Sequence, residues 1–116
     1  MDIESKKGSV QVMKLWIDDI RPAPEGYTWI KSVDLAKLII LQNGKVTRNH
    51  TVYYIDIIDL DHDAGIYAEN GGDYIKLLDW MEEQGINDIP IHIHSTNPVD
   101  AANMRRIIRR NNWEEV

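Results

Sequence analysis

The stretch YYIDIIDLDHDAG, from Tyr53 to Gly65, decides how the rest of the chain is interpreted. It begins as an apolar run typical of a buried strand, and residues 56–63 hold four aspartates and one histidine. Burying a charged group is costly unless it is paired or ligated. The stretch therefore predicts a core strand that leads into a site for a phosphate or a metal ion.

The composition predicts one soluble domain. The chain has 116 residues, of which 43% are hydrophobic and 28% charged, which is ordinary for a globular protein. We expect a polar lead over residues 1–10 and a single domain over residues 11–116. The absence of cysteine excludes disulfides, thiolate zinc sites and cysteine catalysis. No stretch approaches the roughly 20 apolar residues of a membrane span, and residues 1–11 hold no apolar run, so we expect a cytoplasmic protein.

The charge pattern restricts the partners. The net charge of −6 argues against broad binding to duplex nucleic acid, but it leaves room for a small basic patch around one phosphate. Four arginines crowd near the C-terminus: Arg105, Arg106, Arg109 and Arg110. We interpret them as one solvated helix face, with contact to an RNA backbone as the alternative.

Strands and helices are expected to alternate along the chain. The predicted strands cover residues 12–18, 27–31, 51–60 and 89–95, with residues 113–116 as a last short strand or a tail. The predicted helices begin after Ser32, near Tyr74 and after Asn97, and end near Asn43, Gly85 and Arg110. This alternation predicts an α/β sandwich with a mostly parallel sheet, in which ligands bind beyond the carboxyl ends of the strands.

Polar residues follow three of these strands where each one ends. They are Asp18 and Asp19, then Asp61, His62 and Asp63, and finally His94 and Ser95. Because the carboxyl ends of parallel strands meet at one edge, these groups are expected to converge on one rim.

The aspartates at this rim could hold a divalent cation. Mg²⁺ favours one or two carboxylates together with water and phosphate oxygens. Asp18 and Asp19, with Asp61 or Asp63, provide such a set, so Mg²⁺ or another divalent cation is a candidate cofactor. The alternative is that the acidic pair only stabilises a turn.

Two histidines are candidates for proton transfer. His62 lies between two aspartates, which favour a protonated ring suited to acid–base catalysis. His94 and His92 point to the same side of their strand. His94 is closer to the carboxyl end and is the better candidate for chemistry, whereas we expect His92 to be hydrogen-bonded in the interior.

Three further residues are candidate phosphate ligands. Ser95 and Asn97 precede the N-terminus of a helix, where free N–H groups attract anions. The alternative for Asn97 is that it only caps this helix. Arg21 could bind a phosphate in a bidentate manner, or it could form a surface ion pair with a neighbouring aspartate.

The arrangement resembles the receiver domain of response regulators. The matching residues are an acidic pair (Asp18 and Asp19), an aspartate after the central strand (Asp61) and a hydroxyl after the next (Ser95). The resemblance implies a three-layer, flavodoxin-like sandwich in which the pair binds Mg²⁺ and Asp61 accepts a phosphoryl group. Two features depart from the pattern: no lysine follows Lys76, and IRPAPEG stands where the first helix would begin.

A closer resemblance is to the cyclic-phosphate-processing receiver domains. Their motifs are matched by DDIRPAPEG (18–26), LDHDAG (60–65, with Ala64 for leucine) and HSTNP (94–98). This resemblance implies a hydrolase that acts on a cyclic phosphate, in a small molecule or at an RNA end, with His62, His94 and Asp61 as catalytic residues. Two alternatives stay open. One is a signalling receiver phosphorylated on Asp61, with a protein partner on its receiver-like surface. The other is a non-catalytic binding module.

Overall fold

The computed structural model of the chain describes residues 12–48 and 50–116. The polar lead predicted for residues 1–10 lies outside these residues. The strands are β1 (Met13–Ile17), β2 (Thr28–Ile30), β3 (Gly44–Thr47), β4 (His50–Tyr53), β5 (Ile55–Leu60) and β6 (Ile91–Ile93). The helices are α2 (Val33–Gln42), the 3₁₀ helix η1 (Gly65–Glu69), α3 (Ile75–Gln84) and α4 (Pro98–Arg110). None of these helices is long and apolar enough to cross a membrane.

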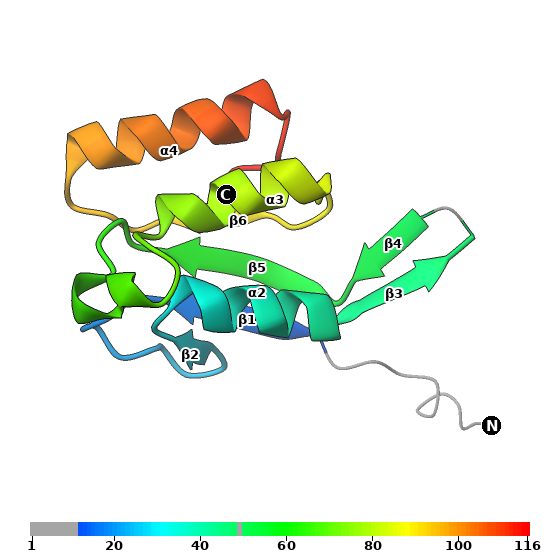
Figure 1. Cartoon of the computed structure of the whole chain (residues 1–116), viewed down its shortest axis with the longest axis horizontal. Helices are drawn as coiled ribbons and strands as arrows, with labels where there is room; N and C mark the ends of the chain where they lie inside the picture. The colour runs from blue at the N-terminus through cyan, green and yellow to red at the C-terminus, as the bar shows by residue number, and fades with distance from the viewer. Residues whose placement is uncertain (1–11, 49) are drawn as a thin grey trace.

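A four-stranded parallel sheet forms the centre of the molecule (Figure 1). Its order is β2-β1-β5-β6, with β2 at one edge as expected. A single parallel bridge between Ile91 and Glu115 adds the last residues of the chain beside β6. The predicted α/β receiver-like fold is therefore confirmed.

The helices begin and end where the local sequence predicts. Ser32 caps α2 by accepting the N–H of Leu35 at 3.1 Å. The side chain of Asn97 caps α4, and Pro98 occupies its first turn. At the end of α3, Gly85 adopts a φ of 70°, a left-handed conformation that glycine takes at little cost.

The first helix of the receiver pattern is missing, as predicted. Residues 18–27 connect β1 to β2 without any helix. The connections that contain α2 and α3 run in the same direction across the sheet, as does the one that contains α4. Right-handed crossovers in one direction place their helices on the same face of the sheet. Helix α3 accordingly packs against both α2 and α4. The described domain therefore has one layer of α-helices on its sheet, and not the two layers of the three-layer sandwich that the resemblance implied. The strand side chains that are fully enclosed in this core include Leu15, Ile17, Ile58, Leu60 and Ile91.

The connection between α2 and β5 differs from the prediction. Residues 44–50 were expected to be a polar connector, and residues 51–60 one continuous strand. The structure instead has an antiparallel ribbon of β3 and β4, which ends before β5 begins at Ile55. The N–H of Tyr54 donates to the carbonyl of Asn43 at 2.8 Å and closes the base of this ribbon.

Candidate functional site

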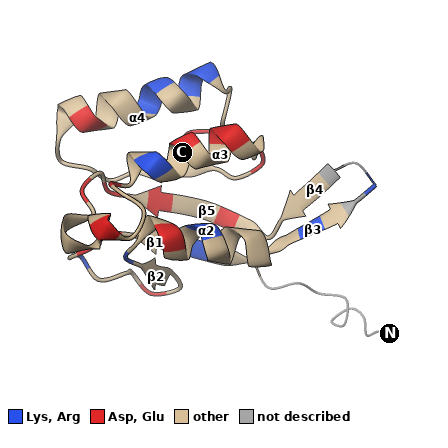
Figure 2. Ribbon diagram, viewed as in Figure 1, with Lys and Arg blue, Asp and Glu red and all other residues tan. Residues whose placement is uncertain are grey.

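The carboxyl ends of β1, β5 and β6 bring the predicted polar residues together. Asp18 follows β1, Asp61 follows β5 and His94 follows β6, and these three strands are neighbours in the sheet. Acidic residues gather around the end of β5 in the charge-coloured view (Figure 2). Asp18 and Asp61 are both buried, so the rim holds enclosed carboxylates rather than solvated ones.

Asp18 is held by the loop that follows it. Its Oδ1 accepts the main-chain N–H groups of Ile20 at 2.9 Å and Arg21 at 3.0 Å. Its Oδ2 lies 2.8 Å from Nε2 of His94. Burial raises the pKa of Asp18, but these hydrogen bonds outweigh burial and hold the pKa below its ordinary value of 3.8. Asp18 is therefore a fixed, ionised acceptor.

His94 is enclosed between two carboxylates. Its Nδ1 lies 2.6 Å from Oδ1 of Asp59, and its Nε2 contacts Asp18. The ring also stacks on the indole of Trp16, with centroids 3.9 Å apart and planes 3° from parallel. Burial lowers the pKa of His94, but the hydrogen bonds to Asp59 and Asp18 outweigh it and hold the pKa above 6.5.

Asp59 is a site residue whose role the sequence did not reveal. It is 7% exposed and lies on β5, where its partner in the register with β6 is His92. Asp59 lies two residues before Asp61, which places both side chains on one face of the strand, and its hydrogen-bond partner is His94. Alternation along β5 and β6 could have suggested this pair only if the two strands had been known to be neighbours.

Three donors lie close enough together to hold a metal ion. One ligand atom each from Asp18, Asp61 and His94 falls within 4.8 Å of the other two. The predicted acidic set is therefore brought together only in part, with a histidine in place of the other carboxylates.

Asp19 and Asp63 lie outside this group of three donors. Burial and the negative charges of Asp18 and Asp63 raise the pKa of Asp19. Asp63 accepts the N–H of Gly65 at 2.8 Å, which is turn chemistry. As metal ligands, Asp19 and Asp63 stay predictions.

His62 forms a second centre beside the first. Its Nδ1 lies 2.6 Å from Oγ of Ser95 and 3.1 Å from Oδ1 of Asp61. Its Nε2 lies 3.4 Å from Oδ2 of Asp100. Asp61 is thus shared between the centre at His62 and the three donors around His94.

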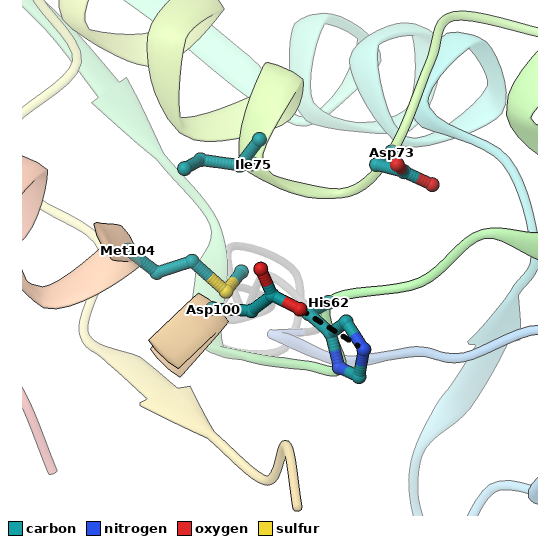
Figure 3. Close-up of a pocket in the computed structure, with 5 residues that line it drawn as sticks. All are labelled: His62, Asp73, Ile75, Asp100 and Met104. Atoms are coloured by element: carbon teal, nitrogen blue, oxygen red, sulfur yellow. Dashed lines mark ion pairs between the residues drawn. The ribbon is translucent and has the colours of Figure 1, made fainter. Parts of the chain in front are cut away.

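A small pocket of about 80 Å³ opens beside His62. Its lining combines His62 and two carboxylates with two apolar side chains: Asp73, Asp100, Ile75 and Met104. Figure 3 shows Asp100 and His62 directed toward each other, with Asp73 and Ile75 across the opening. Asp100 was not singled out in the sequence, where its only signal is an acidic side chain in the first turn of a helix.

A comparison with protein families identifies the family of the chain. The model of the cyclic-phosphate processing receiver domain matches residues 13–110. The chain belongs to this family. Searches of curated proteins and of solved structures found no match. The family match spans both centres of the site, including the two histidines and the four aspartates that contact them.

In this cyclic-phosphate processing receiver domain, Arg21 lies at the edge of the site. Its Nη1 donates to the main-chain carbonyl of His94 at 3.2 Å, and within residues 12–48 and 50–116 no ion pair joins it to an aspartate. Asn97 accepts the N–H groups of Val99 at 3.0 Å and Asp100 at 3.1 Å, so it caps α4. Two of the N–H groups expected to attract a phosphate are therefore already used, and contact between Asn97 and substrate stays a prediction.

The arginines of α4 are mostly engaged within the domain. Arg105 donates to Glu115 at 2.6 Å, and Arg110 donates to Glu82 at 2.7 and 2.8 Å. Arg106 contacts Asn103. These contacts fit the interpretation of a solvated helix face better than that of a surface for RNA.

His92 is hydrogen-bonded as expected, but it is not in the interior. It is half-buried, and its Nδ1 contacts the main-chain oxygen of Val116. It therefore provides a matched control for His94, which lies two residues further along the chain.

Proposed function

We propose that this domain is a hydrolase that opens the ring of a cyclic phosphate ester, with a 2′,3′-cyclic nucleotide or RNA end as the substrate. The observation that carries the proposal is the position of His62, which contacts Ser95 and Asp61 beside a pocket at the carboxyl edge of the sheet. Ligands of parallel α/β sheets bind at this edge. The family match supports the substrate class.

His62 is assigned the proton transfer. Carboxylate oxygens of Asp61 and Asp100 lie near its two ring nitrogens, which keeps an N–H oriented at the rim of the pocket. Its side chain is 24% exposed, so a substrate can reach it. As a general acid, His62 gives its proton to the ribose oxygen as the bond from that oxygen to phosphorus breaks. The attacking water forms the new bond to phosphorus and releases one proton to solvent. A positioned acid of this kind contributes about 10²–10⁴-fold to a rate.

His94 is less suited to passing a proton than the sequence suggested. Carboxylates hold both of its nitrogens at 2.6 and 2.8 Å, and its side chain is only 11% exposed. Nε2 of His62 is 3.4 Å from its nearest carboxylate, and the side chain of His62 is 24% exposed. The geometry favours His94 as a fixed residue of the site that does not transfer a proton to the substrate. We therefore assign the acid–base role to His62 and a ligand role to His94.

Asp18, Asp61 and His94 fit a divalent cation by the chemistry of their donors. Two enclosed carboxylates and one imidazole lie within 4.8 Å of one another, and Asp59 orients the imidazole. When bound there, such an ion would polarise a phosphoryl oxygen as a Lewis acid. Arg21 at the same edge is assigned to the phosphoryl oxygens, and Ser95 to positioning His62.

The proposal is tested by ³¹P NMR of the purified domain with a 2′,3′-cyclic nucleotide. We expect a phosphomonoester resonance to appear, and its position identifies the ribose oxygen that has left. Labelling of the domain by a small phosphodonor, lost in Asp61→Asn, would instead support a phosphorylated receiver. An unchanged cyclic resonance together with tight binding would support a module that binds without turnover.

A further inference from the structure

The enclosed charges around His94 do not balance. Asp18, Asp59 and Asp61 are 1%, 7% and 8% exposed. Among the described residues, His94 contacts two of them, Asp61 is shared with His62, and the Arg21 guanidinium contacts the main-chain carbonyl of His94 rather than a carboxylate. Buried carboxylates need compensating positive charge. A divalent cation at Asp18, Asp61 and His94 would supply it.

The contact between His94 and Asp18 has the spacing of two ligands of one ion. A nitrogen and an oxygen that each lie about 2.1 Å from a metal in adjacent octahedral positions are about 3 Å apart. The observed separation of Nε2 and Oδ2 is 2.8 Å. The two atoms of this hydrogen bond therefore have a separation that two ligands of one metal ion would also have.

The donor set selects the class of metal. Mg²⁺ takes oxygen ligands and keeps much of its water, whereas imidazole suits first-row transition metals. A site with an enclosed imidazole between carboxylates therefore differs from the all-oxygen site implied by the receiver resemblance. The stacking of the His94 ring on Trp16 further fixes the direction of its nitrogens.

Asp59 orients the His94 ring through the nitrogen that does not face Asp18. It holds Nδ1 of His94 at 2.6 Å, on the side of the ring away from the other donors. A histidine that binds a metal commonly donates its second N–H to a carboxylate, which fixes the tautomer and the orientation of the ring. Asp59 is thus a positioning residue.

We infer that His94, oriented by Asp59, makes this rim a site for a first-row transition metal such as Mn²⁺, Co²⁺ or Zn²⁺ in preference to Mg²⁺. The inference deepens the proposed function, because it concerns the same site. Binding can nevertheless be measured without any substrate. A metal-binding result therefore decides this inference, and turnover of a cyclic phosphate decides the proposed function.

The test is to titrate the metal-free domain with Co²⁺ and with Mg²⁺. Binding is measured by calorimetry, and for Co²⁺ also by its visible absorption. We expect Co²⁺ to bind the wild type more tightly. His94→Asn should weaken Co²⁺ binding at least 10-fold and leave Mg²⁺ binding nearly unchanged. Asp59→Asn should weaken Co²⁺ binding about 10–100-fold, as expected for loss of a carboxylate behind a histidine ligand.

Two substitutions serve as matched controls. His92→Asn removes a half-buried histidine from the same strand, and Asp56→Asn removes an exposed carboxylate from the same strand as Asp59. Both should bind Co²⁺ like the wild type. Equal loss in the controls, unchanged Co²⁺ affinity in His94→Asn, or no Co²⁺ binding by the wild type would each overturn the inference.

A measurement on the wild type avoids dependence on the folding of the variants. In a ¹⁵N–¹H NMR spectrum of the histidine rings, Zn²⁺ should shift the Nε2 resonance of His94 and leave that of His92 in place. A Zn²⁺-induced shift confined to other histidines would contradict the assignment.

Discussion

The imidazole of His94 joins two buried carboxylates, with Asp59 2.6 Å from Nδ1 and Asp18 2.8 Å from Nε2. The three residues come from three different segments, and the parallel sheet brings them to one edge. This chain of contacts links the packing of the sheet to the chemistry of the rim. It also determines how the domain should respond to pH.

In the metal-free domain, His94 should titrate above pH 6.5. Its pKa is raised in the folded state, so its protonated form stabilises the fold fully below pH 6.5, and this contribution is lost as the pH rises through the folded pKa. Histidine NMR in the presence of a chelator measures the midpoint. Asp59→Asn should lower it, because one carboxylate partner is removed, whereas a midpoint that stays in place would contradict the assigned hydrogen bond.

Glu82 should titrate far below an ordinary glutamate. Hydrogen bonds from Arg110 and Asn111 lower the pKa of Glu82 from 4.5 to about 2. The stabilisation it provides is present above pH 4.5 and is lost as the pH falls toward 2. Carboxyl NMR should show a midpoint near 2 in the wild type, and a return toward 4.5 in Arg110→Ala. The same midpoint in both proteins would show that the pair does not form in solution.

Gly65→Ala should disturb the acidic rim. Gly65 has a φ of 56°, and an added Cβ would collide with the carboxylate of Asp19. Gly26→Ala is the matched control, because Gly26 has a φ of 87° but nothing within 4 Å of an added Cβ. Both substitutions strain the backbone, at about 1 kcal/mol or more in free energy of unfolding. Only Gly65→Ala should also reduce turnover, so equal activity in the two variants would contradict a role for the Asp19 region.

Ile58→Ala should destabilise the fold more than a surface substitution. Ile58 is fully enclosed in the centre of β5, whereas Ile66 is 79% exposed. Removal of a buried isoleucine side chain costs about 2–5 kcal/mol in free energy of unfolding. Urea denaturation should show this loss for Ile58→Ala and almost none for Ile66→Ala. Similar losses would mean that Ile58 is not enclosed in solution.

The elements with strong local signals were predictable from the sequence. The helix caps at Ser32 and Asn97 and the stop at Gly85 are set by residues within one turn, and all three were confirmed. The β3–β4 ribbon was missed, because its residues continue directly into the apolar run of β5. The break falls at Tyr54, whose N–H donates to Asn43 and whose carbonyl accepts the N–H of Met13.

The location of the candidate site could be predicted from the sequence, but the contacts between its residues could not. Polar residues at strand ends indicated the rim, since the rule for parallel sheets depends only on the order of elements. The contact of Asp59 with His94 depends on which strands are neighbours, and that of Asp100 with His62 depends on how α4 docks. Neither relationship is encoded locally.

The most direct test of the central claim is the rate of ring opening in His62→Gln, followed by ³¹P NMR with a 2′,3′-cyclic nucleotide. His92→Gln is measured beside it, because His92 lies outside the site. If His62 protonates the leaving ribose oxygen, His62→Gln should lose about 10²–10⁴-fold in rate while His92→Gln keeps the rate of the wild type. Equal rates in His62→Gln and the wild type would contradict the account.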